Sequence, residues 1–261
     1  MPTSSGLLNL TPNYIVILFL MSVRISALLL TTPILGARTV PAMTKIALAL
    51  VLSLVLMPTV APAAVMPQTF GHLVVAIGKE VVIGLLAGFA VTLLYSSLQM
   101  VATLAGVQIG FGFSNTVDVT YAGQSPVLDH LFTGMATLIF LSGNFHHPFL
   151  MGIQGLFDIL PPNGFSLYRI SPDGLIGLSG NMFLVALRIV LPLLGALLLT
   201  DMALGVMART APQMNVFFVG MPIKIAIGIF AIIVMLPFVA NQIESLFGQT
   251  TRDMAMILRY R

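Results

Sequence analysis

The residues of this chain that could do chemistry are few, and their spacing matches no catalytic site. Eight acidic residues are scattered along 261 residues, and no pair of them is spaced as a general acid and base. Lys79 follows Gly78, but Glu80 stands where a phosphate-binding loop needs Ser or Thr. His146 and His147 are adjacent, so we expect their side chains to point apart, and no further ligand lies at metal-binding spacing. We therefore expect a protein that is not an enzyme and holds no cofactor and no metal.

Composition places the chain in a membrane. Hydrophobic residues make up 58% of it and charged residues only 7%, with a mean hydropathy of +1.05. The surface of a soluble protein carries far more charge than that. Cysteine is absent, which excludes disulfides and thiolate metal sites. An all-α integral membrane protein is the expected fold class, because only helices and closed barrels satisfy their backbone in lipid and the period-two alternation of barrel strands is absent.

The gaps between charged residues divide the chain into segments. Long charge-free gaps each leave room for a helix of roughly 20 residues, the length that spans a bilayer. Six apolar helical segments are predicted, at about residues 13–32, 43–61, 72–100, 127–150, 175–200 and 215–240. We expect one polytopic domain over 1–261, with first hairpins in 13–100, a glycine-rich loop in 101–126, later hairpins in 127–240 and a basic tail in 241–261.

Three of the apolar segments, the first, the fifth and the sixth, carry a basic side chain well inside their length. Arg24, Arg188 and Lys224 are energetically costly in lipid unless each pairs with an opposite charge or is reached by water. We interpret them as structural pairs with Asp201 or with a neighbouring subunit, and a direct transport role is the alternative.

Small residues at four-residue spacing predict close helix packing. Gly84 and Gly88 form one such pair in the third segment, and Gly106 and Gly110 form another just after it.

The stretch GVQIGFGFSNTVDVTYAGQSP, residues 106–126, is the main candidate for function. Non-helical backbone is tolerated at membrane depth only where it is buried in protein or lines a watery cavity. Its glycines allow tight turns, and its alternating Val, Ile and Phe side chains can seal against water. Because Asp118 is its only charge, a dewetting plug fits better than an ion filter. A plain connecting loop is the alternative.

Three runs of sequence resemble one family. They are LGARTVPAMTKIALAL (35–50), GFGFSNTVDVTYAGQSPVL (110–128) and DMALGVMARTAPQMNVFFVGMPIK (201–224). In their order and in total length they resemble the FliR family of type III export-gate subunits, which includes the T-type subunits of virulence injectisomes. The second run is similar to the flagellar members. The third is the most specific, since it combines Asp201, Gly205, Arg209, Pro212, Gln213, Asn215, Gly220, Pro222 and Lys224 at fixed intervals.

The resemblance implies a fold, a function and a place in the cell. The fold would resemble a fusion of FliP and FliQ, with kinked hairpins in a helical export-gate assembly. The function would be that of a core subunit of the flagellar export gate in the bacterial inner (cytoplasmic) membrane, at the flagellar basal body. Implied partners are FliP-like, FliQ-like, FlhB-like and FlhA-like proteins, unfolded flagellar proteins as substrates and the lipid membrane, with no nucleic acid.

The resemblance also implies roles for individual residues. In the family the glycine-rich loop closes the channel, which by position corresponds to about residues 106–122 here. The residues assigned to this plug are Gly106, Gln108, Gly110, Phe111, Gly112, Phe113, Asn115 and Asp118, and all of them except Gly106 and Gln108 fall on the family's loop pattern. Val119 departs from the family, where proline is common, so the end of the loop is expected to turn differently. The polar residues expected to anchor the hairpins and their partners are Arg24, Arg188, Asp201, Arg209, Gln213, Asn215 and Lys224.

Two alternatives stay open. The chain could be the injectisome homologue, which shares the architecture. It could also be a small-solute secondary transporter, which the broken helices and intramembrane arginines would allow. Two features count against the transporter. The sequence shows no evident internal inverted repeat and no central acidic residue that could bind a coupling ion.

Overall fold

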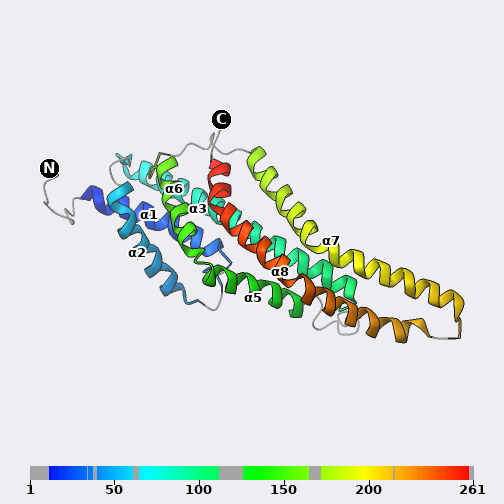
Figure 1. The fold of residues 1–261 in the computed structure, drawn as a ribbon. Coiled ribbons are helices and arrows are strands. Elements are labelled where there is room, and N and C mark those ends of the chain that lie inside the picture. The colour runs from blue at the N-terminus through cyan, green and yellow to red at the C-terminus, as the bar shows by residue number, and fades with distance from the viewer. Residues whose placement is uncertain are drawn as a thin grey trace. The chain divides into compact units, whose positions relative to one another are not determined.

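The computed structural model describes residues 12–33, 35–37, 40–60, 65–111, 126–164, 172–213 and 215–258. In this part of the chain all regular structure is helical, which confirms the predicted all-α class (Figure 1). The helices are α1 (Pro12–Thr31), α2 (Ala42–Val60), α3 (Phe70–Ile109), α5 (Pro126–Ser142), α6 (His146–Ile159), α7 (Pro172–Thr210) and α8 (Val216–Leu258).

Five of these helices are long and apolar enough to cross a membrane. They are α1, α2, α3, α7 and, within α8, Phe218–Gln249. Helix α5 is apolar but too short to meet the same criterion. The chain is therefore an integral membrane protein, as its composition predicted.

The fourth predicted segment, 127–150, is broken in two. Helix α5 ends where Asn144 adopts a left-handed backbone with φ 54°. Phe145 N donates to Phe140 O at 3.1 Å and Asn144 N to Leu141 O at 3.4 Å, the pair of bonds that defines a Schellman helix end. Asn tolerates this conformation better than most residues, and α6 starts immediately afterwards.

Two other helices were predicted too short. Helix α3 continues to Ile109 instead of ending at 100, so residues 101–109 of the expected loop are helical. Its buried stripe continues through Ala102, Ala105 and Ile109, which gives this extra length a packed face. Helix α8 likewise continues to Leu258 through most of the expected tail.

The contacts group the chain into two compact units. Unit 1 comprises residues 1–93, 146–178 and 249–261. In it α2 packs against α1 and contacts α6, while the first half of α3 also contacts α1. Its interior is built largely from α1 side chains such as Leu20, Met21 and Ile25, together with Ile83 and Phe157.

Unit 2 comprises residues 94–145 and 179–248. Within it α7 and α8 form an antiparallel hairpin that turns at residues 211–213 (Figure 1). A Cβ added at Gly220 would lie 3.1 Å from Leu204 Cδ1, so the two helices are close there. Phe247 of α8 contacts the rings of Tyr95, Phe140 and Phe145 at centroid distances of 6.1, 5.2 and 5.3 Å.

Candidate functional site

The end of α3 is where the candidate plug segment begins, and it is a well-formed helix cap. Gly110 has φ 105°, a conformation that favours glycine. Phe111 N donates to Gly106 O at 2.9 Å, and Gly110 N donates to Val107 O at 3.2 Å. These are the two bonds of a Schellman motif, so the helix terminates at a defined residue.

The predicted plug residues therefore divide into three groups. Gly106 and Gln108 belong to the last turns of α3, where sequence analysis expected loop. Gly110 and Phe111 form the cap itself. Gly112, Phe113, Asn115 and Asp118 lie outside the described residues.

The second predicted glycine pair is used differently from the first. Nothing lies within 4 Å of a Cβ added at Gly110, so this glycine ends the helix and does not pack against another. At Gly84, in unit 1, an added Cβ would overlap Arg24 O and lie 2.7 Å from Ala27 Cβ. At Gly88 it would overlap Thr31 Oγ1. The close helix packing predicted for Gly84 and Gly88 is confirmed, and it joins α3 to α1.

A polar cluster in unit 2 joins residues from both predicted groups. Lys224 Nζ on α8 lies 2.9 Å from each carboxylate oxygen of Asp201 on α7. Gln108 Nε2 on α3 donates to Asp201 Oδ2 at 3.1 Å. The Asp201 and Lys224 side chains are 39% and 22% exposed, so the cluster is partly shielded from solvent. The prediction that Lys224 pairs with Asp201 is confirmed.

The other predicted polar residues of unit 2 do not join this cluster. Arg209, Gln213 and Asn215 are exposed around the turn of the α7–α8 hairpin. Asn215 O accepts from Phe218 N at 3.0 Å and from Val219 N at 3.3 Å, so Asn215 is the N-cap residue directly before α8. Arg188 is exposed on α7.

Arg24 has a different partner from the one predicted. Its Nε lies 2.5 Å from Glu80 Oε2 on α3, and the two side chains are 1% and 0% exposed. Arg24 Nη1 also donates to Leu160 O at 2.7 Å, and the guanidinium lies 4.4 Å from the centre of the Phe157 ring. Pairing with Asp201 was therefore wrong for Arg24, because α1 and α3 pack directly on each other at Gly84.

Glu80 is the residue that sequence analysis missed. It links Arg24 to the turn after α6, because its Oε1 accepts from Asn163 N at 2.8 Å. Asn163 has φ 60° and also donates through Nδ2 to Val65 O at 3.2 Å. The available signal was an acidic residue in an apolar segment, which needs a basic partner as much as an intramembrane arginine does.

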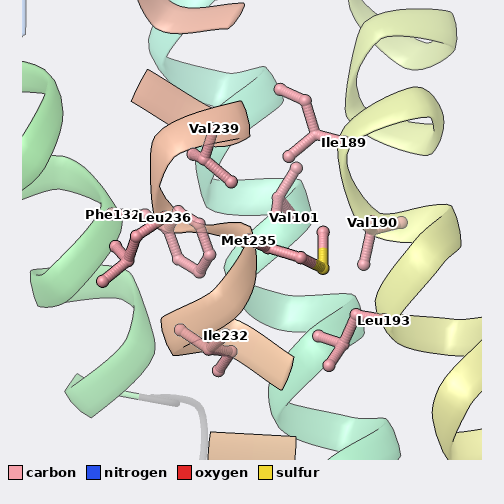
Figure 2. A pocket seen from close by; sticks show the side chains of 9 residues that line it. All are labelled: Val101, Phe132, Ile189, Val190, Leu193, Ile232, Met235, Leu236 and Val239. Carbon is pink, nitrogen blue, oxygen red and sulfur yellow. The ribbon is translucent and has the colours of Figure 1, made fainter. Parts of the chain in front are cut away.

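The described part of the chain shows no catalytic arrangement. An apolar crevice in unit 2 is lined by side chains from α3, α5, α7 and α8, none of them polar (Figure 2). His146 and His147 do not point apart as expected, since their ring centroids lie 5.2 Å apart. No group of three potential metal ligands gathers among the residues that were placed.

Comparison with known proteins decides the family. A sequence model of the bacterial export proteins, family 1, matches residues 15–250. The chain belongs to the bacterial export proteins, family 1. This confirms the family resemblance predicted from the three motifs.

Curated members of the export family match nearly the whole chain. The flagellar biosynthetic protein FliR of Bacillus subtilis (strain 168) is 30% identical over 262 residues, which cover 97% of each chain. FliR of Escherichia coli (strain K12) is 30% identical over 235 residues, 90% of each chain. FliR of Aquifex aeolicus (strain VF5) is 28% identical over 235 residues, 90% of this chain and 91% of the relative. The similarity therefore includes both units and the segment between α3 and α5.

Proposed function

We propose that this chain is a non-enzymatic core subunit of the flagellar type III protein export gate. With FliP-like and FliQ-like subunits it forms the channel through which unfolded flagellar proteins leave the cytoplasm during flagellum assembly. The observation that carries this proposal is the similarity to flagellar FliR along nearly the full length of both chains. FlhB-like and FlhA-like components are the further partners, and the site of assembly is the bacterial inner membrane at the flagellar basal body.

Helix length supports a subunit of an assembly over a simple bundle in lipid. Helices α3, α7 and α8 have 40, 39 and 43 residues. At 1.5 Å per residue each is about 60 Å long, twice the roughly 30 Å thickness of the hydrocarbon core. A tilt of 40° still leaves about 46 Å along the membrane normal, so part of each helix must extend beyond the lipid.

Exposed apolar side chains on these helices support the same interpretation. Met202 and Val206 on α7 are 58% and 64% exposed, and Phe218 and Phe230 on α8 are 74% and 67% exposed. Wherever these helices extend beyond lipid, exposed apolar side chains of this kind need a protein partner to cover them. Neighbouring FliP-like and FliQ-like subunits would supply that cover, in an assembly resembling the fold that the motifs implied.

The segment that starts at Gly110 is the proposed channel plug. The cap at Gly110 and Phe111 ends α3 sharply, which allows the chain to leave the helix at once. The glycines, apolar side chains and single charge of residues 110–122 suit a seal that excludes water without binding ions. Gly112, Phe113, Asn115 and Asp118 are proposed to contribute to this seal.

Co-purification tests the assembly. The full chain with a carboxyl-terminal tag is extracted in mild detergent, and the proteins that accompany it are identified and quantified by mass spectrometry. FliP-like and FliQ-like proteins in a fixed ratio are expected. Injectisome counterparts in their place would redirect the proposal to virulence secretion. A lone chain or a self-oligomer would contradict it and favour the small-solute transporter.

Loop deletion tests the plug. Cells that express the complete gate with residues 112–122 deleted should lose membrane potential through an ion leak, whereas the wild-type gate should hold it. A matched control replaces the same residues with an unrelated sequence of equal length. A deletion that leaves the potential intact would contradict the plug while leaving the assembly proposal standing.

A further inference from the structure

The last turn of α3 is held by two neighbouring residues within unit 2. Gln108 donates to Asp201 on α7, as described above. Ile109, only 1% exposed, lies against Gly228 on α8. A Cβ added at Gly228 would lie 2.5 Å from Ile109 Cγ1, 2.9 Å from Cδ1 and 3.2 Å from Cγ2. Gly228 is therefore a notch that receives the branched side chain of Ile109.

Together these two contacts restrain rotation of α3 about its own axis. Consecutive residues on a helix project about 100° apart, so Gln108 and Ile109 lie on different faces of α3. A contact on one face alone leaves the helix able to rotate about its axis. Contacts on two faces restrain that rotation, and with it the direction in which the chain leaves the helix at Gly110.

The polar contact depends on Lys224. An isolated carboxylate could choose among rotamers, but Lys224 Nζ lies 2.9 Å from both Asp201 oxygens and holds it toward α8. Hydrogen bonds to a charged acceptor are stronger than those between neutral groups, which favours the Gln108 contact. Lys224 and Gly228 are four residues apart on α8 and share a face. The same face of α8 therefore supports both the Gln108 contact and the Ile109 contact.

We propose that Asp201, held by Lys224, and Gly228 form an anchor that fixes the orientation of the α3 end through Gln108 and Ile109. These are positioning residues for the proposed plug, because they set where the chain enters the segment after Gly110. The inference rests on the proposed function for its effect on the channel, and on the contacts of unit 2 for the anchor itself.

A spin label tests the anchor without reference to transport. The chain has no native cysteine, so Val107→Cys gives a single labelling site in the last turn of α3. Val107 is 62% exposed, so the chain itself leaves room for a label there. In the full chain in mild detergent, Gln108→Glu places a carboxylate against Asp201 and should shorten the rotational correlation time of the label by about twofold or more. The double variant Gln108→Glu with Asp201→Asn should restore it, because the amide introduced by the second substitution can donate to the new carboxylate.

Matched variants separate the anchor from general disturbance of α3. Gln99→Glu adds the same charge at an exposed position of the same helix and should leave the label unchanged. Gly228→Ala should mobilise it, whereas Gly195→Ala, where nothing lies within 4 Å, should not. An unchanged label in Gln108→Glu, or a failure of Asp201→Asn to restore it, would overturn the anchor.

Membrane potential tests the effect on the channel. Cells that carry the Gln108→Glu gate should show a leak smaller than that of the 112–122 deletion, and the double variant should abolish it. If the deletion leaks and Gln108→Glu does not, the positioning role is overturned. If the deletion itself does not leak, the proposed plug fails, and the spin label alone decides whether the anchor exists.

Discussion

Removing the charge of Glu80 is the sharpest test of how unit 1 is held together. In Glu80→Gln the guanidinium of Arg24 stays in an interior where its side chain is 1% exposed, without its carboxylate. Arg24 would keep Leu160 O and the Phe157 ring, and the introduced amide oxygen could still accept from Asn163 N. The main loss is therefore the negative charge that compensates the buried positive charge of Arg24.

The expected magnitude follows from that loss. Breaking a buried ion pair by removing one partner costs about 3–5 kcal/mol, and the retained contacts put this variant near 3 kcal/mol. That is a decrease of about 150-fold in the ratio of folded to unfolded protein. Arg24→Met, which leaves the Glu80 carboxylate buried, should cost a similar amount.

The double variant Arg24→Met with Glu80→Gln distinguishes charge compensation from simple loss of contacts. It removes both charges and keeps an acceptor for Asn163 N, so we expect a cost of about 3 kcal/mol, well below the sum of about 6 for the two singles. Glu244→Gln, which removes an exposed carboxylate from α8, is the control and should stay within about 0.5 kcal/mol of wild type.

Steric trapping in mild detergent can measure these free energies of unfolding. Streptavidin binds two biotinylated cysteines in unit 1 only when that unit opens, and the absence of native cysteine makes the labelling specific. Two results would refute the reasoning. One is a loss of unfolding free energy in the double variant equal to the sum of the two single losses. The other is a loss of less than about 1 kcal/mol in either single variant.

Three further predictions use the same measurement. Gly84→Ala should destabilise unit 1 by about 1–3 kcal/mol because its Cβ would overlap the backbone of α1, whereas Gly78→Ala, with open space around it, should be neutral or stabilising by up to about 1 kcal/mol. Asn163→Ala should cost about 1–2 kcal/mol more than Asn163→Gly, because only glycine keeps φ 60° without strain; equal costs would contradict this. With the cysteine pair in unit 2, Gly110→Ala should cost about 1–2 kcal/mol through its φ of 105°, while Gly195→Ala in α7 should cost nothing measurable.

Helix boundaries show where sequence patterns are weak. Charge-free gaps located the helices but not their ends. The end of α3 was predicted near residue 100, inside a charge-free gap that continues to residue 117, whereas the chain stays helical to Ile109. A gap in charge says only where lipid is tolerated, whereas helix ends depend on caps such as Gly110. The break between α5 and α6 did have a local signal, because Gly143 and Asn144 are both residues that favour a left-handed turn.

Side-chain partners show a second limit. The pairing of Lys224 with Asp201 could be predicted because both lie in one sequence motif on adjacent helices. The pairing of Arg24 with Glu80 could not, because the two are 56 residues apart and meet only where Gly84 lets α3 approach α1. Predicting that contact requires the packing of the helices and not only their positions in the chain.

Sequence alone determined the membrane class, the helical architecture and the family, because composition, segment length and motif spacing are local properties of the chain. The roles of individual polar residues and glycines were decided only by tertiary structure. Glu80 became the partner of Arg24, Asp201 became an acceptor shared by Lys224 and Gln108, and Gly228 became a notch for Ile109. Each of these depends on two or three helices reaching one place in three dimensions, since a buried charge or a close backbone approach is stabilised only by what packs against it.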